Sequence, residues 1–166
     1  MNKTQILNHR QIEQKLNRIA WQIFEDNANE KAIIIAGING NGYEIAKSIT
    51  NLLEKISDIK VSLTELVINK EQPFSNDISV SLGVDDYKEK VVILIDDVLN
   101  SGKTMIYGVK HFLNVPLKKL NTAVLLDRQH NRFPIKADYV GTSLSTTIQE
   151  HITVELNETE SVAYLS

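Results

Sequence analysis

Cysteine is absent from the 166-residue sequence, which excludes disulfide bonds and thiolate metal centres. No apolar run approaches transmembrane length, and the first residues, MNKTQILNHRQ, lack the apolar core of a secretory signal. No group of histidine, aspartate and glutamate has the spacing of a protein metal cage, so any metal ion is expected to arrive with a ligand. The net charge of −3 gives no overall attraction to nucleic acid. We therefore expect a cytoplasmic protein with no membrane segment.

The chain is long enough for one domain with a sizeable core, since 42% of its residues are apolar. Short apolar runs alternate with amphipathic patterns, which predicts an α/β fold with a mainly parallel sheet of about five strands. Strands are expected at 32–36, 59–67, 91–95 and 120–126, and helices at 8–27, 43–56 and 105–113. Residues 68–90 indicate a loop or a loop with a weak ribbon, and the last residues indicate a hairpin. Ligands of such a sheet bind beyond the carboxyl ends of its strands.

The stretch from Val91 to Thr104, VVILIDDVLNSGKT, indicates a buried strand that leads into a helix through a short polar turn. Two adjacent carboxylates, Asp96 and Asp97, follow the apolar residues and suit a hydroxylated sugar or a hydrated magnesium ion. The turn after them would present backbone N–H groups at a helix N-terminus, which favours a phosphate. It consists of Asn100, Ser101, Gly102, Lys103 and Thr104. The plain alternative is that the carboxylates only begin a loop and the turn only caps a helix.

A second glycine-rich loop, GINGNG, follows the strand expected at 32–36. Its glycines permit positive φ angles and a close approach of a ligand to the backbone. Neither loop fits a better-known nucleotide motif. The glycines of GINGNG do not complete a dinucleotide fingerprint, and SGKT lacks the earlier glycine of a triphosphate-binding loop, because position 97 is Asp. Asn39 and Asp127 both follow expected strands and should converge with the central carboxylates, so that the two loops hold two phosphate groups of one ligand.

The central stretch resembles the phosphoribosyl-pyrophosphate (PRPP) signature of the type I phosphoribosyltransferases: an apolar strand, two acidic residues, a spacer, then Ser/Thr-Gly-x-Ser/Thr. Two further segments, ILNHRQIEQKLNRIAWQIFEDN and DRQHNRFPIKADYVGTSLSTT, are similar to the bacterial bifunctional family of pyrimidine-operon regulators and uracil phosphoribosyltransferases. The resemblance covers most of the chain and is weakest at 68–90. It implies one phosphoribosyltransferase domain over 1–166, a twisted parallel sheet flanked by helices, a flexible loop at about 68–90 and a small hood at about 127–150.

The same resemblance implies a role for each polar residue. The turn Asn100–Thr104 would hold the 5′-phosphate of PRPP. Asp96 and Asp97 would act as the catalytic pair that contacts the ribose hydroxyls, directly or through Mg²⁺ brought by the substrate. Asn39 and Gly40 would lie along the pyrophosphate. Weaker candidates for PRPP binding are Lys70, Asp127 and Arg128.

Three features depart from that family's pattern. The pyrophosphate loop carries asparagine at positions 39 and 41, where the family usually has a basic residue. Lys70 is the only cation in the stretch that corresponds to the family's mobile loop, and a lysine does not replace an arginine at a bidentate phosphate contact. Asn100 stands where purine-specific relatives often have Asp, which favours a pyrimidine base.

These observations lead to three hypotheses of function. The first is Mg²⁺-dependent transfer of ribose 5-phosphate from PRPP to a nucleobase, with uracil as the base that the resemblance favours and UMP as product. The second is a nucleotide-sensing regulator of pyrimidine genes, and the third is a member that binds nucleotide without turnover. The regulator would bind RNA through basic side chains that otherwise form ordinary solvated surface, namely Arg10, Arg18, His130, Arg132 and Lys136. A homo-oligomer is expected by resemblance only.

Overall fold

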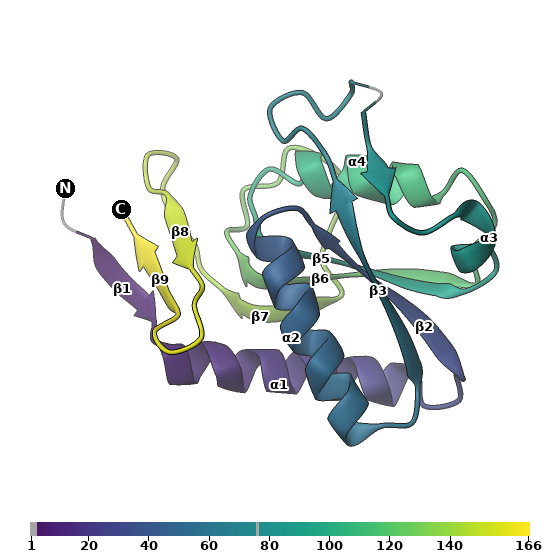
Figure 1. The fold of residues 1–166 in the computed structure, drawn as a ribbon. Coiled ribbons are helices and arrows are strands. Elements are labelled where there is room, and N and C mark those ends of the chain that lie inside the picture. The colour runs from purple at the N-terminus through teal and green to yellow at the C-terminus, as the bar shows by residue number, and fades with distance from the viewer. Residues whose placement is uncertain (1–2, 76) are drawn as a thin grey trace.

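The structure, a computed structural model, describes residues 3–75 and 77–166. Helices and strands alternate along most of the chain, as the sequence predicts (Figure 1). In chain order they are β1 (Thr4–Leu7), α1 (His9–Asp26), β2 (Ala32–Ile38), α2 (Asn41–Ile56), β3 (Lys60–Val67), β4 (Ser79–Val80), α3 (Val84–Tyr87), β5 (Val91–Leu99), α4 (Lys103–Phe112), β6 (Lys119–Asp127), β7 (Tyr139–Ser143), β8 (Ile152–Glu155) and β9 (Val162–Leu165). Within the described residues, no helix is long and apolar enough to cross a membrane.

Five parallel strands form the main sheet, in the order β3-β2-β5-β6-β7, which confirms the predicted α/β class. The short β4 pairs antiparallel with β3 at one edge. Strand β5 lies in the middle, between β2 and β6. Because neighbouring strands run in the same direction, the carboxyl ends of β2, β5 and β6 meet at one edge of the sheet, where a ligand of such a fold binds.

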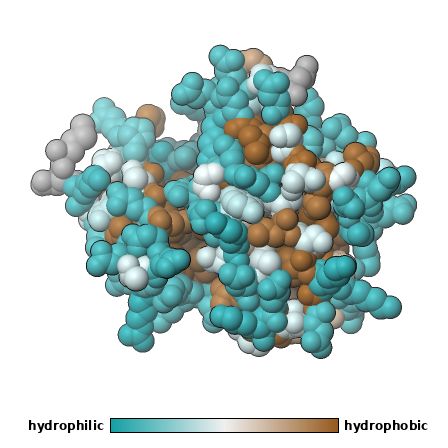
Figure 2. Space-filling view, viewed as in Figure 1, coloured by the Kyte–Doolittle hydropathy of each residue, from teal (hydrophilic) through white to brown (hydrophobic). Residues whose placement is uncertain are grey.

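The sheet has an apolar core on each face, because successive residues of a strand point to opposite sides. Ile33, Ile35 and Ile93 pack with α1 and α2 on one face. Ile34 and Val92 pack with α3 and α4 on the other. Helices on both faces account for the uninterrupted apolar runs of β2 and β5. Seen from the α2 side, the surface is mostly hydrophilic, with hydrophobic patches beside that helix (Figure 2).

Strand β5 is longer than predicted, and this changes how its carboxylates are held. It continues through Leu99, so Asp96 and Asp97 lie inside the strand and not just after it. Strand β6 extends equally far and pairs with this end of β5. Strand β2 stops earlier, since its last pair with β5 joins Gly37 to Ile95. The two carboxylates therefore lie where β5 keeps one neighbouring strand and loses the other.

Both ends of the chain form a second, antiparallel sheet in the order β1-β9-β8 (Figure 1). The hairpin β8–β9 was predicted, whereas β1 was not, because a four-residue strand with one buried side chain gives a weak pattern. Within the segment expected as a hood, at about 127–150, β7 joins the main sheet beside β6. The loop expected at 68–90 contains the weak ribbon β4 and also the short helix α3.

Helix α1 begins with a reciprocal cap between Asn8 and Gln11. The Asn8 side-chain oxygen accepts from the Gln11 N–H at 2.9 Å, and the Gln11 side chain accepts from the Asn8 N–H at 2.9 Å. These two bonds satisfy backbone donors that the first turn of a helix leaves without partners. The buried face of the helix then consists of Ile12, Leu16, Ile19, Ala20 and Ile23.

Replacing the cap tests how much this start contributes to stability. We expect Asn8→Ala to lower the free energy of unfolding by about 1 kcal/mol, because one N–H acceptor is lost. Gln14→Ala, on an exposed part of the same helix, is the control and should change it by less than about 0.5 kcal/mol. Urea denaturation followed by circular dichroism measures both, and equal effects of the two substitutions would contradict a capping role.

Candidate functional site

The acidic end of β5 is built from side chains and backbone N–H groups together. The Asp96 carboxylate accepts from the Asp97 N–H at 2.9 Å, and the Asp97 carboxylate accepts from the Val98 N–H at 2.8 Å. Asn41, at the start of α2, donates to the other Asp97 oxygen at 3.0 Å and to the Val154 carbonyl of β8 at 2.8 Å. Asn41 thus connects the acidic pair of the main sheet to β8 of the second sheet.

Asp96 is the more deeply buried of the two carboxylates. Burial and, to a smaller extent, the neighbouring charge of Asp97 raise the pKa of Asp96 to about 8, although the Lys70 ammonium opposes both effects. The Lys70 Nζ lies 3.8 Å from Asp96 Oδ1, at the limit of an ion pair. Asp96 therefore keeps its proton at neutral pH, and a cation placed beside it would favour its ionised form.

The turn after β5 packs against the segment that follows β6, which holds it in place. Gly102 has φ +83°, and a Cβ there would lie 2.5 Å from Ile135 Cγ2, so both the backbone angle and the space require glycine. The Ser101 carbonyl accepts from the N–H groups of Arg132 at 2.8 Å and Phe133 at 3.1 Å. This packing presents the N-terminus of α4 toward the acidic end of β5.

The loop between β2 and α2 packs against both the acidic pair and the end of β3. Gly42, in the first turn of α2, allows that helix to approach β5 closely, since a Cβ there would lie 2.9 Å from Asp96 Oδ1. Asn39 accepts from the Ile68 N–H at 3.0 Å through its side chain and donates its own N–H to the Leu66 carbonyl at 2.9 Å. The Asn39 side-chain oxygen is therefore used within the protein.

Residues brought together at this edge of the sheet line a cleft of about 100 Å³. Its lining comprises Lys70, Asp96, Asp97, Val98, Leu99, Asn100, Ser101, Gly102, Lys103, Thr104 and Met105. The loop after β3 borders the cleft, because Lys103 Nζ donates to the Glu71 carbonyl at 3.5 Å and lies 5.8 Å from the centre of the Phe74 ring. A wider hollow of about 420 Å³ adjoins it, lined by Asn100, Ser101, Arg128, His130, Arg132 and Ile148.

Arg128 and Asp127 are buried and hold other parts of the site. The Arg128 guanidinium donates to the Asn100 side chain at 3.1 Å, to the Thr146 hydroxyl at 3.0 Å, and to carbonyls of the 147–150 segment. The Asp127 carboxylate accepts from the Gln129 N–H at 2.8 Å. Arg128 therefore links the turn Asn100–Thr104 to the segment before β8.

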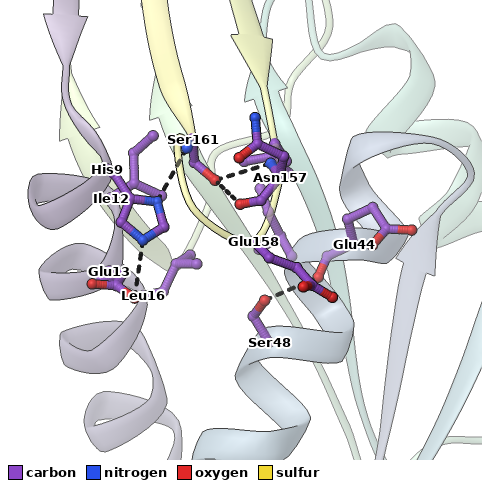
Figure 3. Close-up of a pocket in the computed structure, with 11 residues that line it drawn as sticks. His9, Ile12, Glu13, Leu16, Glu44, Ser48, Asn157, Glu158 and Ser161 are labelled. Carbon is purple, nitrogen blue, oxygen red and sulfur yellow. Dashed lines mark hydrogen bonds and ion pairs between the residues drawn. The ribbon is translucent and has the colours of Figure 1, made fainter.

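A cavity of about 260 Å³ lies elsewhere, between α1, α2 and the β8–β9 turn (Figure 3). His9 accepts there from the Ser161 N–H at 3.1 Å and lies 3.3 Å from the Glu13 carboxylate (Figure 3). Glu44 and Glu158 also line it, so its charge would repel a phosphate. The cleft at the end of β5 is consequently the better candidate for an anionic ligand.

Comparison with known proteins agrees with this geometry. The chain matches the family described as "Phosphoribosyl transferase domain" over residues 2–159. The chain belongs to the phosphoribosyltransferases. It is 36% identical to "Bifunctional protein PyrR" of Clostridium novyi, over 96% of this chain and 93% of that protein. It is 32% identical to the protein of the same name from Streptococcus agalactiae, over 95% of this chain and 92% of that one.

Solved phosphoribosyltransferase structures share the fold. A hypoxanthine-guanine phosphoribosyltransferase from Bacillus anthracis superposes with a TM-score of 0.72 at 21% identity, covering 90% of this chain and 86% of that one. The hypoxanthine phosphoribosyltransferase of Trypanosoma cruzi gives 0.75 at 15% identity, covering 96% and 95%. The expected membership and fold class are thus confirmed, and this phosphoribosyltransferase is by family a glycosyltransferase.

Several residues around the cleft of this phosphoribosyltransferase were absent from the sequence-based list. Asn41 and Gly42 belong to a loop that the sequence singled out, but their contacts with the acidic pair are long-range and leave no local pattern. Ile148, which lines the wider hollow, is 80% exposed although it is apolar. The one signal that the sequence offered for this residue is an isoleucine within an otherwise polar segment.

The raised pKa of Asp96 makes stability depend on pH. The folded protein holds a proton between pH 4 and 8 that the unfolded chain releases, so this carboxyl makes the protein less stable as the pH rises through that range. We expect Asp96→Asn to be more stable than the wild type at pH 8, by an amount on the order of a few kcal/mol, and the difference to vanish near pH 4. Thermal unfolding from pH 4 to 9 measures this, and a constant difference would contradict it.

The requirement for glycine at position 102 gives a second expectation. Gly102→Ala should lower the free energy of unfolding by about 2 kcal/mol or more, because the backbone is left-handed there and the added methyl meets Ile135. Ile135→Ala in the same chain should restore part of that loss by making room. Chemical denaturation of the two single variants and the double variant measures the coupling, and strict additivity would exclude the steric explanation.

Proposed function

We propose that the protein is a Mg²⁺-dependent phosphoribosyltransferase that transfers ribose 5-phosphate from PRPP to a nucleobase, with uracil as the first candidate and UMP as product. One observation carries the proposal: a single strand, turn and helix place two carboxylates and a helix N-terminus on the same small cleft. Phosphate and ribose hydroxyls are the groups that this pair of features suits.

The ligand's parts are assigned by charge and donor type. The turn from Asn100 to Thr104 would bind the 5′-phosphate through its N–H groups, aided by the charge of Lys103. Asp96 and Asp97 would accept hydrogen bonds from the ribose hydroxyls. Gly40, next to Asn39 at the start of α2, would lie along the pyrophosphate. The buried Asp127 and Arg128 would stabilise these ligand-binding segments, and Arg128 does so by donating a hydrogen bond to Asn100.

Magnesium fits this donor set as a partner of the substrate. Within residues 3–75 and 77–166, no group of three or more histidine, aspartate or glutamate side chains could hold a metal ion unaided. Asp96 and Asp97 offer hard oxygen donors, and Mg²⁺ commonly binds one or two carboxylates together with substrate phosphates. When bound, the ion neutralises charge on the departing pyrophosphate.

The proposed reaction gives each of these groups a part. A ring nitrogen of the base forms a bond to the anomeric carbon, pyrophosphate departs with the electron pair of the bond that breaks, and the nitrogen loses its proton to solvent. Positive charge develops on the ribose, beside the carboxylates of β5. The adjoining hollow, with Ile148 at its edge, would receive the base. The loop after β3 would limit the access of water.

The relatives named "Bifunctional protein PyrR" favour a pyrimidine base and also a second function. That second function is nucleotide-dependent RNA binding in the regulation of pyrimidine genes. In this alternative the protein has weak or no catalytic activity. Its basic residues are partly committed, since Arg18 donates to the Val140 and Gly141 carbonyls at the edge of β7. We also propose that the protein works in the cytoplasm as a homo-oligomer, as the resemblance implies.

Turnover with a panel of bases tests the main proposal. We expect pyrophosphate release from PRPP and Mg²⁺ with uracil, and little release with hypoxanthine, guanine, adenine or orotate. The double variant Asp96→Asn/Asp97→Asn should lose at least about a hundredfold of this activity, because amides replace the two carboxyl groups that would bind the ribose hydroxyls and the Mg²⁺ of the substrate. The matched control, Asp85→Asn/Asp86→Asn, removes an adjacent pair of exposed aspartates from α3 and should retain activity.

Absence of turnover with every base, together with tight UMP binding by calorimetry, would overturn the enzyme proposal and leave the regulator. Salt-dependent binding of a pyrimidine-operon leader RNA would then support the second function. Binding of neither PRPP nor UMP would overturn both.

A further inference from the structure

We propose that Lys70 is the cation that binds the pyrophosphate group of PRPP, and that Asn39 is a positioning residue that keeps Lys70 over the loop between β2 and α2. This inference rests on the proposed function and concerns the same site. Lys70, which follows β3, would supply the positive charge that the loop between β2 and α2 lacks.

The loop between β2 and α2 offers little charge to a pyrophosphate. Residues 38–42 read INGNG and contain no lysine or arginine. Its two asparagines are engaged in the protein, since Asn39 accepts from the Ile68 N–H and Asn41 donates to Asp97 and to the Val154 carbonyl. A ligand with several negative charges would therefore need a cation from another segment.

Lys70 supplies such a cation at the right place. A Cβ built on Gly40 would lie 4.0 Å from the Lys70 Nζ, so the ammonium lies directly over the turn that begins α2. The same Nζ is 3.8 Å from Asp96 Oδ1 and lines the cleft. Its side chain is 44% exposed, which leaves it accessible to a ligand. Lys70 thus stands between the acidic pair and the loop assigned to pyrophosphate.

Contacts on both sides of Lys70 hold its backbone in place. On one side, Asn39 bonds to Leu66 and Ile68, which fixes the end of β3 against the end of β2. On the other, the Asn69 side chain accepts from the N–H groups of Glu71 at 3.0 Å and Gln72 at 3.1 Å, forming a local turn. Asn39 therefore acts on a pyrophosphate through the position of Lys70.

This arrangement predicts discrimination between two ligands of the same cleft. PRPP and UMP share the ribose and the 5′-phosphate, but only PRPP carries a pyrophosphate. Lys103, in the turn for the shared phosphate, should affect both ligands. Lys70 should affect PRPP alone, because the group that it faces is missing from UMP.

Calorimetric titration of the full chain with PRPP plus Mg²⁺, and separately with UMP, tests the inference. We expect Lys70→Met to weaken PRPP binding at least about tenfold and UMP binding less than about twofold. Lys70→Arg keeps the charge and should restore most of the PRPP affinity. Lys103→Met should weaken both ligands, and Lys60→Met, at the exposed far end of β3, should weaken neither.

A double-mutant cycle tests the role of Asn39. If Asn39 acts through Lys70, Asn39→Ala weakens PRPP binding on its own but adds nothing to Lys70→Met. Additive losses would instead make Asn39 a direct ligand and overturn its positioning role. Equal weakening of PRPP and UMP by Lys70→Met, or no weakening of PRPP, would overturn the assignment of Lys70. A wild type that binds neither ligand would overturn the proposed function itself, which is a distinguishable result.

Discussion

Two adjacent carboxylates at the buried end of β5 are the constraint on which the surrounding segments depend. A buried, unpaired carboxylate costs several kcal/mol, and two side by side repel each other as well. The structure meets this cost in three ways: Asp96 retains its proton, backbone N–H groups donate to both side chains, and Asn41 donates to Asp97. Gly42 matters because any side chain there would separate α2 from this end of the strand. The segments that stabilise the pair are also those that would bind its ligand.

The functional consequence comes from combining opposite electrostatic features on one continuous stretch of chain. The strand ends in hydrogen-bond acceptors, and the helix that follows begins with donors. A ligand with hydroxyls at one end and a phosphate at the other matches that order. The buried Arg128 extends this arrangement to the 146–150 segment through Asn100, so that the wall of the wider hollow is tied to the same turn. Ligand binding and the packing after β6 should therefore be coupled.

The sequence predicted the parts of this molecule whose pattern is local. The apolar runs of β2 and β5, the amphipathic helix α1 and the polar turn around Gly102 all follow from spacing. Prediction from the sequence failed where pairing with a segment distant in the chain determines the structure. Strand β7 joins β6, and β1 pairs with β9 across the whole length of the chain. Strand β5 runs past its expected end because β6 accompanies it, and no property of Asp96 itself indicates this.

The asparagines Asn39 and Asn41, between β2 and α2, illustrate the same limit at the site. Judged along the chain, a loop that lacks its usual basic residue has lost a charge. Judged in space, β3 ends beside β2, and Asn39 itself makes the contact that brings the two ends together. Because a Coulomb interaction depends on the distance between charges and not on their separation in sequence, an ammonium over Gly40 acts on a bound anion much as one within the loop would. A departure from a family motif thus becomes informative only when the space around the altered residue is known.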